Sequence, residues 1–354
     1  MGDDVRAAQK SMLAAVWHGA AVVELEQQPV PTPEADQVLV RILACGLCAT
    51  DLHMLDGQFP LAVPPRIVGH EMVGQIIGLG QGVSARRLGD LVALQGVSNC
   101  GRCRLCSEGR VHECPNRVGF GGGWAEYTVS PEHLAYRLPE GLAPHIGAVA
   151  EPLAAVVNAI RTARIQAGDT VAVVGAGAIG LLTLQMARHS GASRTLVSDP
   201  EPARRALAER LGATTTVDPR AVKLADFVRD WTDGIGVDVA FEAAGTIHTI
   251  NETLALPRPG GTVVLVGGAP GGAELTIEPY ELWLRSISIH LTYAHTASDF
   301  RRAVELLPTL DIEPMLTHRY PLTDIHAAIQ TARRRESVKL LVVPDSPGAG
   351  IGFK

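Results

Sequence analysis

The sequence predicts an α/β protein with a doubly wound parallel sheet and a second, β-rich domain, for two reasons. From residue 12 to about residue 150, short β-branched stretches are cut by glycine and proline, a spacing typical of a curled, strand-rich domain. From about residue 152, apolar strands alternate with helical stretches, which indicates right-handed βαβ units and a parallel sheet. At 354 residues the chain is long enough for about two domains with cores of their own.

The same patterns predict the domain limits. We expect flexible polar tails at residues 1–11 and 345–354. The β-rich domain covers residues 12–156 and includes a cysteine-rich lobe at about residues 96–116. Residues 157–294 form the parallel-sheet domain, and residues 295–344 return to the first domain. In chain order, the strands are expected in "MLAAVWHG", "QVLVRIL", "EMVGQIIGLG", "DLVALQG" and "AEYTVS", followed by the helix "EPLAAVVNAIRTARIQ", the strand and helix of "DTVAVVGAGAIGLLTLQMARHSG", and alternating elements from "RTLVSD" to "LTDIHAAIQTARRRESVKLLVV".

Composition excludes several classes of protein. The chain is 46% hydrophobic and 19% charged, so global disorder is not expected. A net charge of -6 provides no basic field for nucleic acid or for an anionic membrane. We find no signal-peptide pattern and no apolar run as long as a membrane span, and we expect a cytoplasmic protein. Only four of the 31 basic residues are lysines, which is typical of a GC-rich bacterial genome.

Four of the six cysteines lie in one short loop with the spacing C-x2-C-x2-C-x7-C. Three cysteines two residues apart can surround one small ion, and a fourth closes a tetrahedron, which is the pattern of a structural zinc site. In a reducing compartment, clustered cysteines are more often metal ligands than disulfides. An iron–sulfur cluster and free thiols are the alternatives. The cysteines are Cys100, Cys103, Cys106 and Cys114, and Arg102, Arg104 and Arg110 are candidates to offset their negative charge.

A second group of possible metal ligands is spread over three segments. Cys48 lies in "CGLCATDLH", His70 and Glu71 lie in "VGHEMVGQIIGLGQGV", and Glu151 lies in "AVAEPLAA". Three protein ligands and one open position are the arrangement of a catalytic zinc ion. Taken singly, a histidine is more often a core residue than a ligand, and Glu151 is also compatible with a place at a helix N-terminus, where the dipole favours a carboxylate. The conjunction of the four residues favours a metal.

A glycine-rich turn follows an apolar strand in "VVGAGAIG". Gly175, Gly177 and Gly180 form G-x-G-x-x-G, and Ala178 and Ile179 open the helix that follows. The first two glycines permit a tight turn and the close approach of a pyrophosphate, and the third permits packing of the helix on the strand. The turn therefore predicts a dinucleotide site.

Asp199 ends the next strand, about 20 residues further on, where a carboxylate accepts hydrogen bonds from ribose hydroxyls. The same carboxylate repels a 2′-phosphate, so NAD is favoured over NADP. Two features leave alternatives open: Asp199 is also placed to cap the helix in "PEPARRAL", and Arg204 and Arg205 are close enough in sequence to accommodate a phosphate.

On these motifs the chain, from Met12 to about Pro344, resembles the zinc-containing medium-chain dehydrogenases, the superfamily of zinc alcohol, sorbitol and threonine dehydrogenases. The resemblance rests on G-H-E-x2-G-x5-G-x2-V, the four-cysteine lobe and the nucleotide fingerprint. It implies a Rossmann sheet joined to a GroES-like catalytic domain. It also makes Cys48 and His70 zinc ligands and leaves Cys45 a buried thiol. The third ligand is implied to be Glu151, as in the polyol and threonine branches, although Glu71 is an alternative.

The resemblance also implies a mechanism. Zinc lowers the pKa of the substrate alcohol, and the nicotinamide accepts the hydride. Thr50 takes the proton and passes it through the cofactor ribose to His53. Asp51 accepts a hydrogen bond from His70, and Glu71 either coordinates zinc in one state or lies behind the ligands.

The resemblance further implies two zinc ions and NAD as cofactors, with Val266 and Gly267 beside the nicotinamide, and a homodimer or homotetramer. We expect the substrate to be a secondary hydroxyl of a polyol, sugar or cyclitol. A threonine or simple secondary-alcohol dehydrogenase is the alternative within enzymes. A zinc-stabilised nucleotide-binding module is the alternative outside them, and a zinc-ribbon nucleic-acid binder fits less well with the acidic balance.

The expected substrate pocket departs from the sorbitol pattern. Where that branch tends to have an arginine, this chain has Ala294, between Tyr293 and His295. Carboxylates around the zinc favour a substrate with adjacent hydroxyls. The loop Asp56–Phe59, with Gln58 and Phe59, and the segment before Trp124 are candidate pocket walls, with core packing of the two aromatic rings and solvation of Gln58 as the alternative.

Overall fold

The computed structural model describes residues 10–58, 63–119 and 122–344, which form two compact units. Unit 1 consists of Met1–Glu151 and Thr296–Lys354, and unit 2 of Pro152–His295. The boundary expected at residue 156 falls inside helix α3 (Ala150–Ala163). Strand β1 (Ser11–Gly19) begins one residue before the expected start, and the rest of the expected tails, residues 1–9 and 345–354, lie outside the described residues.

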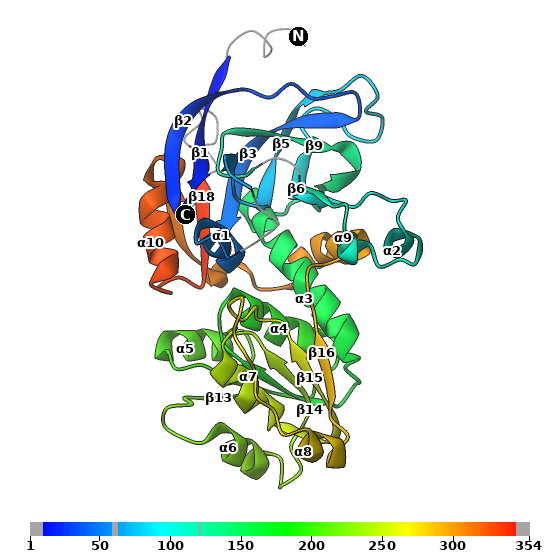
Figure 1. Ribbon diagram of the computed structural model, residues 1–354, viewed down its shortest axis with the longest axis vertical. Helices are drawn as coiled ribbons and strands as arrows, with labels where there is room; N and C mark the ends of the chain where they lie inside the picture. Colours follow the sequence, from blue (N-terminus) through cyan, green and yellow to red (C-terminus); the bar gives the residue numbers. More distant parts are fainter. Residues whose placement is uncertain (1–9, 59–62, 120–121, 345–354) are drawn as a thin grey trace. The chain divides into compact units, whose positions relative to one another are not determined.

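Unit 2 is the predicted parallel sheet with crossover helices (Figure 1). Its six strands have the order β13-β12-β11-β14-β15-β16, so the chain starts in the middle of the sheet and builds outward in both directions. The inner strands are runs of buried valine, leucine and alanine, as expected for strands covered on both faces. The elements are β11 (Thr170–Val174), α4 (Ala178–His189), β12 (Arg194–Ser198), α5 (Pro202–Arg210), β13 (Thr215–Val217), α6 (Leu224–Trp231), β14 (Val237–Glu242), α7 (Ile247–Leu254), β15 (Pro257–Leu265), α8 (Pro279–Leu284) and β16 (Ser288–Leu291).

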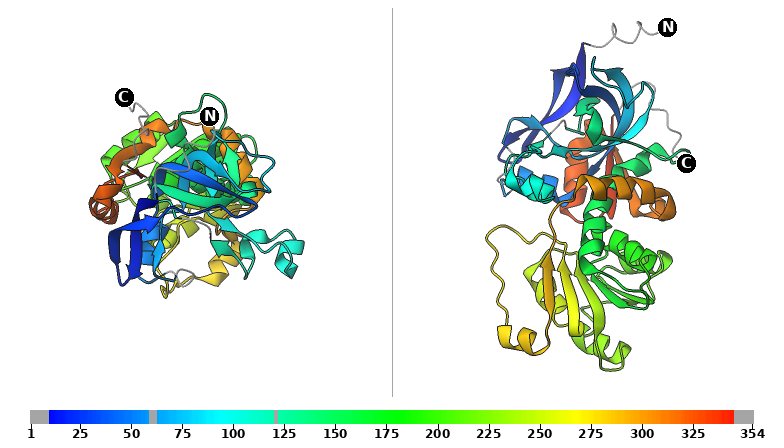
Figure 2. Two further views of the ribbon diagram at one scale, coloured as in Figure 1. Left: turned by 90° about the horizontal axis from the view of Figure 1, so that it is seen from above. Right: turned by 90° about the vertical axis from the view of Figure 1, so that its right-hand side faces the viewer.

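Unit 1 is a curled assembly of mostly antiparallel strands (Figure 2). One sheet has the order β10-β6-β5-β3-β18-β17, with β9 also paired to β3, and a smaller sheet has the order β2-β1-β4. The long strand β3 is the centre, because β5, β9 and β18 all pair with it. The strands are β2 (Val22–Pro29), β3 (Gln37–Leu47), β4 (Arg66–Ile67), β5 (Glu71–Leu79), β6 (Leu91–Gln95), β7 (Val97–Ser98), β8 (Val118–Gly119), β9 (Tyr127–Pro131), β10 (Ala135–Arg137), β17 (Leu316–Pro321) and β18 (Lys339–Val343).

The apolar core of unit 1 lies against the inner face of the large sheet and includes Ile42, Leu94 and Trp124. Strand β18, from the last part of the chain, completes this core beside β3. The helices of unit 1 are α1 (Ala49–Leu55), α2 (Arg104–Ser107), α9 (Ala297–Leu306) and α10 (Ile325–Arg333), with 3₁₀ turns at Val111–Glu113, Glu132–Leu134, Pro144–Val149, Leu307–Thr309, Glu313–Met315 and Leu322–Asp324.

One helical segment of the described residues, Pro144–Ala163, is long and apolar enough to cross a membrane by length and composition. Its most apolar window is 67% buried inside the protein, as for the core helix of a globular domain. We therefore assign its hydrophobicity to packing.

Candidate active site and metal centres

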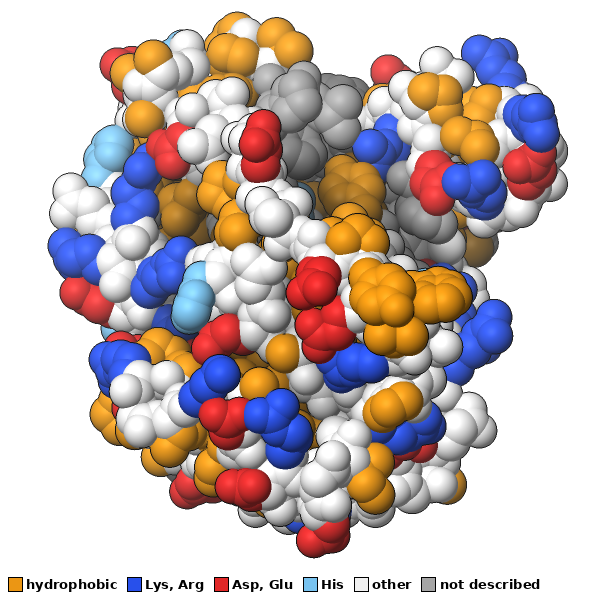
Figure 3. Space-filling view, turned by 60° about the horizontal axis from the view of Figure 1, so that its bottom comes forward, with side chains coloured by type: hydrophobic (Ala, Val, Ile, Leu, Met, Phe, Trp, Pro, Cys, Tyr) orange, Lys and Arg blue, Asp and Glu red, His pale blue; other side chains and the backbone are white. Residues whose placement is uncertain are grey.

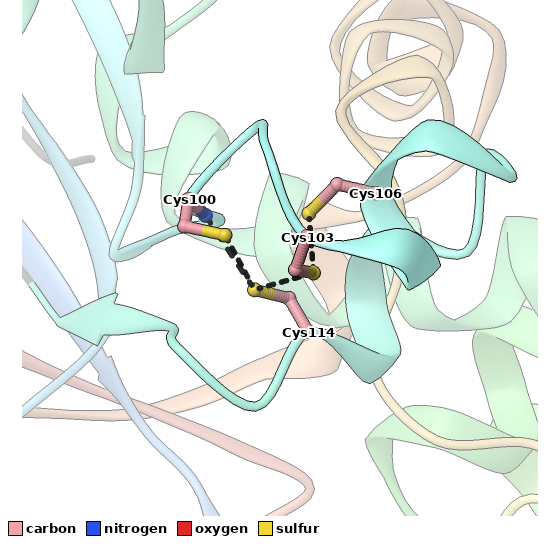
Figure 4. A group of neighbouring side chains, drawn as sticks. All are labelled: Cys100, Cys103, Cys106 and Cys114. Atoms are coloured by element: carbon pink, nitrogen blue, oxygen red, sulfur yellow. Dashed lines mark hydrogen bonds between the residues drawn. The ribbon is translucent and has the colours of Figure 1, made fainter.

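The four cysteines of the lobe between β7 and β8 converge, as Figure 4 shows. Cys103 Sγ lies 3.4 Å from Cys106 Sγ and 3.7 Å from Cys114 Sγ, and Cys114 Sγ lies 3.5 Å from Cys100 Sγ. Thiolates ~2.3 Å from one tetrahedral zinc ion are separated by about 3.8 Å. The sulfur spacing therefore fits a single zinc ion, and it is too close for the wider cage of an iron–sulfur cluster.

The surroundings lower the pKa of Cys100 and of Cys106, which favours their thiolate forms, whereas hydrogen bonding among the sulfurs raises the pKa of Cys103 to about 11. Backbone hydrogen bonds from Arg102 and Cys103 lower the pKa of Cys100 to about 6. The Asn99 amide donates to Cys106 Sγ at 3.5 Å. None of the six cysteines of the chain is in a disulfide.

The arginines expected to offset the thiolates pair with carboxylates instead. Arg104 Nε lies 2.7 Å from Glu108 Oε1, and Arg110 pairs with Glu113. These are exposed pairs at helical spacing, which explains both side chains without the metal. For two of the three arginines, the interpretation as counter-charges is therefore unsupported.

In unit 1, three of the four residues of the second predicted group come together. Possible ligand atoms of Cys48, His70 and Glu71 all lie within 4.8 Å of one another. Cys48 is the N-cap of α1, directly after β3, and His70 and Glu71 lie at the start of β5. The antiparallel register pairs Gly46 with Glu71, which brings these two strand ends side by side.

Asp51 contacts the backbone of Cys48 and the ring of His70. Its buried carboxylate accepts a hydrogen bond from the Cys48 amide at 2.9 Å and lies 3.0 Å from His70 Nδ1. Burial lowers the pKa of His70, but the charge of Asp51 and its hydrogen bond outweigh burial, so that the pKa is raised. With Nδ1 directed at Asp51, Nε2 is the ring nitrogen left for a metal, and it lies 4.0 Å from Glu151 Oε2.

Glu71 is held by a residue that the sequence analysis did not identify. Lys339, the first residue of β18, forms an ion pair with Glu71, and both side chains are almost completely buried. Lys339 Nζ also lies 3.3 Å from the carbonyl oxygen of Leu47. The sequence does contain a sign of this role, because Lys339 begins the apolar run "KLLVV" in a chain with few lysines. Glu71 therefore has a cationic partner supplied by the protein.

The residues predicted to move protons follow Cys48 on α1. Thr50 Oγ1 lies 3.6 Å from Cys48 Sγ. His53 Nδ1 lies 2.9 Å from Gln58 Oε1, and Gln58 N also donates to the His53 carbonyl, so Gln58 orients this ring. The side chain of Gln58 thus contacts His53 while Gln58 stays exposed to solvent, so the alternative of a solvated side chain remains open.

In unit 2, the glycine-rich turn has the shape of a nucleotide-binding turn. Gly175 has φ +102°, and a Cβ at Gly180 would lie 1.8 Å from the Gly175 carbonyl oxygen. A Cβ at Gly177, by contrast, would meet nothing within 4 Å, so the outer side of the turn is open. Ala178 and Ile179 begin α4, whose N-terminal amides suit an anion. The turn therefore fits a pyrophosphate.

Asp199 lies against this turn at the carboxyl end of β12. Its Oδ2 accepts a hydrogen bond from the Ala176 amide at 2.8 Å, and its Oδ1 accepts one from the Glu201 amide at 2.8 Å. The N-cap of α5 is Glu201, which removes the alternative that Asp199 caps that helix. Arg204 Nη1 lies 4.0 Å from Asp199 Oδ2.

Val266 and Gly267 follow β15 and are held by Glu242, at the end of β14. Their amides donate to the Glu242 carbonyl oxygen at 2.9 and 3.0 Å. A Cβ at Gly267 would lie 2.5 Å from Glu242 Oε2, so a side chain there would collide with the buried carboxylate. The Glu242 side chain also accepts from the amides of Ala244 and Gly245 at 2.9 and 2.8 Å.

The aromatic walls expected for the substrate pocket are not supported. Trp124 is completely buried in the core of unit 1, so the packing interpretation holds for it. Phe59 lies outside the described residues. Ala294 has φ +55°, and its carbonyl oxygen accepts from the Asn158 amide at 3.0 Å, so a backbone contact fixes this position.

Comparisons with known proteins agree with this arrangement. Residues 34–140 match the alcohol dehydrogenase GroES-like domain, and residues 178–309 match the zinc-binding dehydrogenase domain. The chain is 32% identical to an L-threonine 3-dehydrogenase of Thermococcus kodakarensis, over 97% of this chain and 99% of that protein. It is 31% identical to a sorbitol dehydrogenase of Bacillus subtilis, over 95% of this chain and 98% of that protein.

Among solved structures, a zinc-binding dehydrogenase from Sinorhizobium meliloti bound to NADP superposes with a TM-score of 0.91 and 35% identity, covering 95% of this chain and 100% of that one. The match extends through both units of the fold. The predicted fold class and the predicted alcohol oxidoreductase activity are thereby confirmed. The chain belongs to the zinc-containing medium-chain dehydrogenase/reductase family, in its sorbitol and threonine dehydrogenase-like branch.

Proposed function

We propose that this protein oxidises the secondary hydroxyl of a polyol, sugar or cyclitol with NAD, at a zinc ion held by Cys48, His70 and Glu151. The convergence of Cys48 and His70 on one buried carboxylate, Asp51, carries the proposal, because it fixes a thiolate and an imidazole for one metal. Glu71 is already neutralised by Lys339, which favours Glu151 as the third ligand. Cys100, Cys103, Cys106 and Cys114 hold a second, structural zinc ion, so each chain carries two.

When bound, zinc lowers the pKa of the substrate hydroxyl, and the nicotinamide accepts the hydride. The residues of the chain bind and move protons. Thr50 Oγ1, adjacent to Cys48, accepts the substrate proton as it releases its own hydroxyl proton, and His53 delivers one proton to water. Gln58 holds the His53 ring by Nδ1, which leaves Nε2 to exchange the proton.

The substrate class rests on the carboxylate chemistry of the site. Glu151 Oε2 lies 4.0 Å from His70 Nε2, and 22% of the Glu151 side chain is exposed, which supports a carboxylate beside the substrate hydroxyl. A carboxylate oxygen accepts a hydrogen bond from a hydroxyl next to the reacting carbon, whereas a monohydric alcohol leaves it unpaired. Threonine carries an ammonium group next to its hydroxyl, and this group can donate a hydrogen bond to such an oxygen. The similarity to threonine dehydrogenases makes L-threonine the second candidate.

The test is NAD reduction with substrates matched in size. We expect 2,3-butanediol to exceed 2-butanol, and cis-1,2-cyclohexanediol to exceed cyclohexanol, by about tenfold or more in kcat/KM. L-threonine is assayed beside them against 2-butanol. If the monohydric alcohols match the diols and threonine is inactive, the protein is a simple secondary-alcohol dehydrogenase. If threonine exceeds every diol, the second candidate replaces the first.

We infer a homodimer or homotetramer in the cytoplasm. The support for assembly is the edge strand β16 and the neighbouring helix α8 of unit 2, which expose large apolar side chains. Trp283 is 71% exposed and Leu291 is 79% exposed. Figure 3 shows exposed hydrophobic side chains gathered on one face of the molecule. A second copy of the chain would cover this surface.

A further inference from the structure

Three arginine side chains surround the loop at the ribose end of the expected cofactor site. Arg204 and Arg205 lie in the first turn of α5, and Arg220 lies in the loop after β13. Strands β12 and β13 are parallel neighbours, with Ser198 opposite Val217, so the residues after them share one edge of the sheet. In parallel sheets this carboxyl edge is where ligands bind. A phosphate on the ribose hydroxyl beside Asp199 would lie among these guanidinium groups.

Two of the three guanidinium groups are engaged by one carboxylate, Asp218. Arg220 Nε lies 3.2 Å from Asp218 Oδ1, and Arg220 Nη2 lies 3.2 Å from Oδ2, a two-point contact. Arg205 Nη1 lies 3.4 Å from Asp218 Oδ2. The side chains of Arg205 and Asp218 are only 19% and 23% exposed, so this pair is held within the protein rather than free in solvent.

Arg205 and Arg220 also contact other oxygen atoms of the protein. Arg205 Nη1 donates to the carbonyl oxygens of Asp199 at 2.7 Å and Pro200 at 2.8 Å, and Arg220 Nη2 donates to that of Pro200. Arg220 Nη1 lies 3.9 Å from Glu201 Oε1. Three guanidinium groups thus face three carboxylates, those of Asp199, Glu201 and Asp218. The local charge is balanced, and a 2′-phosphate would find no excess positive charge.

We propose that Asp218 is a specificity-determining residue for the nicotinamide cofactor, because it neutralises the charge of Arg205 and Arg220, which would otherwise bind a 2′-phosphate. Asp199 disfavours the phosphate directly, whereas Asp218 acts by withholding the cations that would bind it. The inference rests on the proposed preference for NAD. It predicts that removing the charge of Asp218 creates phosphate affinity and leaves the binding of unphosphorylated nucleotide nearly unchanged.

The experiment measures binding of two nucleotide fragments, 5′-AMP and 2′,5′-ADP, to the zinc-loaded protein by calorimetry, so it requires no turnover. The variant is Asp218→Asn, whose amide oxygen can still accept the Arg220 backbone hydrogen bond, 3.0 Å long in the wild type. The matched control is Asp226→Asn on α6, an equal charge change at an exposed pair with Arg229 in the same unit. The variant Asp218→Asn/Arg220→Gln removes both the carboxylate and one of the cations it releases.

We expect the wild type to bind 5′-AMP more tightly than 2′,5′-ADP. Asp218→Asn should raise the relative affinity for 2′,5′-ADP about tenfold, as removal of one unit charge from a partly buried phosphate site implies. The control should change neither affinity, and the double variant should lose most of the gain. A folded Asp218→Asn protein with an unchanged ratio overturns the inference and leaves the NAD preference standing. A wild type that prefers 2′,5′-ADP overturns both.

If Asp218→Asn does not fold, as judged by circular dichroism, Glu201→Gln provides the same test. Glu201 is 58% exposed, so its substitution does not endanger the fold, and it removes the other carboxylate near Arg220. We expect about a threefold shift in the same direction. An unchanged ratio in that variant counts against the inference.

Discussion

At the scale of single residues, Lys339 supplies the cation for the buried carboxylate of Glu71. Lys339→Met should lower the free energy of unfolding by about 3–5 kcal/mol, because it leaves the Glu71 carboxylate buried without a cation. Urea unfolding of the zinc-loaded protein measures this. Lys339→Arg should lose less, and Glu71→Leu/Lys339→Met should recover part of the loss, since no charge is then left unpaired. A Lys339→Met variant whose free energy of unfolding is within about 1 kcal/mol of the wild type would contradict this view of the pair.

Asp199 is the second residue with a defined consequence. Its two carboxylate oxygens each accept a backbone hydrogen bond. An alanine at this position would leave two amide donors unpaired, so a loss of stability would be mixed with any loss of cofactor binding. Asp199→Asn keeps one acceptor and removes the charge. We expect kcat/KM for NAD to fall by about tenfold or more and the ratio of NAD to NADP to approach unity, because hydrogen bonds to a charged acceptor are roughly twice as strong as neutral ones. Steady-state kinetics with both cofactors tests this. An unchanged ratio of NAD to NADP would show that residues other than Asp199 discriminate between the cofactors.

At the scale of elements, the cysteine lobe and the α1 site should respond to mutation in opposite ways. Cys103→Ser opens a closed zinc site, so we expect the zinc content to fall from two ions to one, with a lower melting temperature. His70→Ala should abolish turnover and leave the melting temperature nearly unchanged. Elemental analysis and calorimetric melting measure the two effects. One zinc ion or fewer in the wild-type protein would show that one of the sites does not bind zinc.

Asp238 on β14 fastens three neighbouring strands of unit 2. It accepts hydrogen bonds from Thr170 N at 2.7 Å, from Thr170 Oγ1 at 2.8 Å and from Arg258 Nε at 2.7 Å. Burial alone would raise the pKa of Asp238, but these hydrogen bonds outweigh it, and the pKa is lowered from its ordinary value of 3.8. A carboxylate with a lowered pKa stabilises the fold above the ordinary pKa, and this stabilisation is lost as the pH falls through the folded-state value.

We therefore expect Asp238→Asn to cost about 1–3 kcal/mol at pH 7. The difference from the wild type should persist down to about pH 5 and narrow below about pH 4. Urea unfolding at a series of pH values measures it. A difference that stays constant across this range would show that packing, rather than charge, makes the contribution.

At the scale of the whole molecule, local sequence patterns were enough to predict most of the fold. The strand and turn around Gly175 and the spacing of the four lobe cysteines are short-range features, so the sequence alone is enough to predict them. The pairing of Glu71 with Lys339 is different, because it depends on β18 returning to lie beside β3, with Leu340 opposite Leu47. No pattern in either segment specifies that register.

Two further features escaped the sequence analysis for similar physical reasons. The contacts of Asp218 with two arginines form only where the ends of β12 and β13 meet. Helix α8, residues Pro279–Leu284, is short, and its aromatic side chains are exposed, so neither its length nor its periodicity indicates a helix packed on a core. Side chains that gain their role from tertiary neighbours or from a partner molecule give little signal along the chain.

The last prediction concerns assembly through that exposed surface. Strand β16 is an edge of the sheet and pairs with β15 on its inner side, and Leu291 at its end is 79% exposed. An edge strand with large exposed apolar side chains is a template for pairing with another chain, and a lysine on the edge prevents such pairing. We therefore expect the wild type to sediment as a dimer or larger species at micromolar concentration, and Leu291→Lys to sediment mainly as a monomer.

The control for this prediction is Ile235→Lys. Ile235 is also exposed, at 61%, and belongs to the same unit, in the loop before β14. A lysine there adds the same charge and removes a similar apolar area, so it should leave the sedimentation coefficient unchanged. Because the α8 and β16 side chains would be covered by the second copy, Trp283→Lys should act in the same direction as Leu291→Lys. A wild type that is monomeric up to about 100 μM, or a Leu291→Lys variant as large as the wild type, would mean that this surface does not hold copies of the chain together.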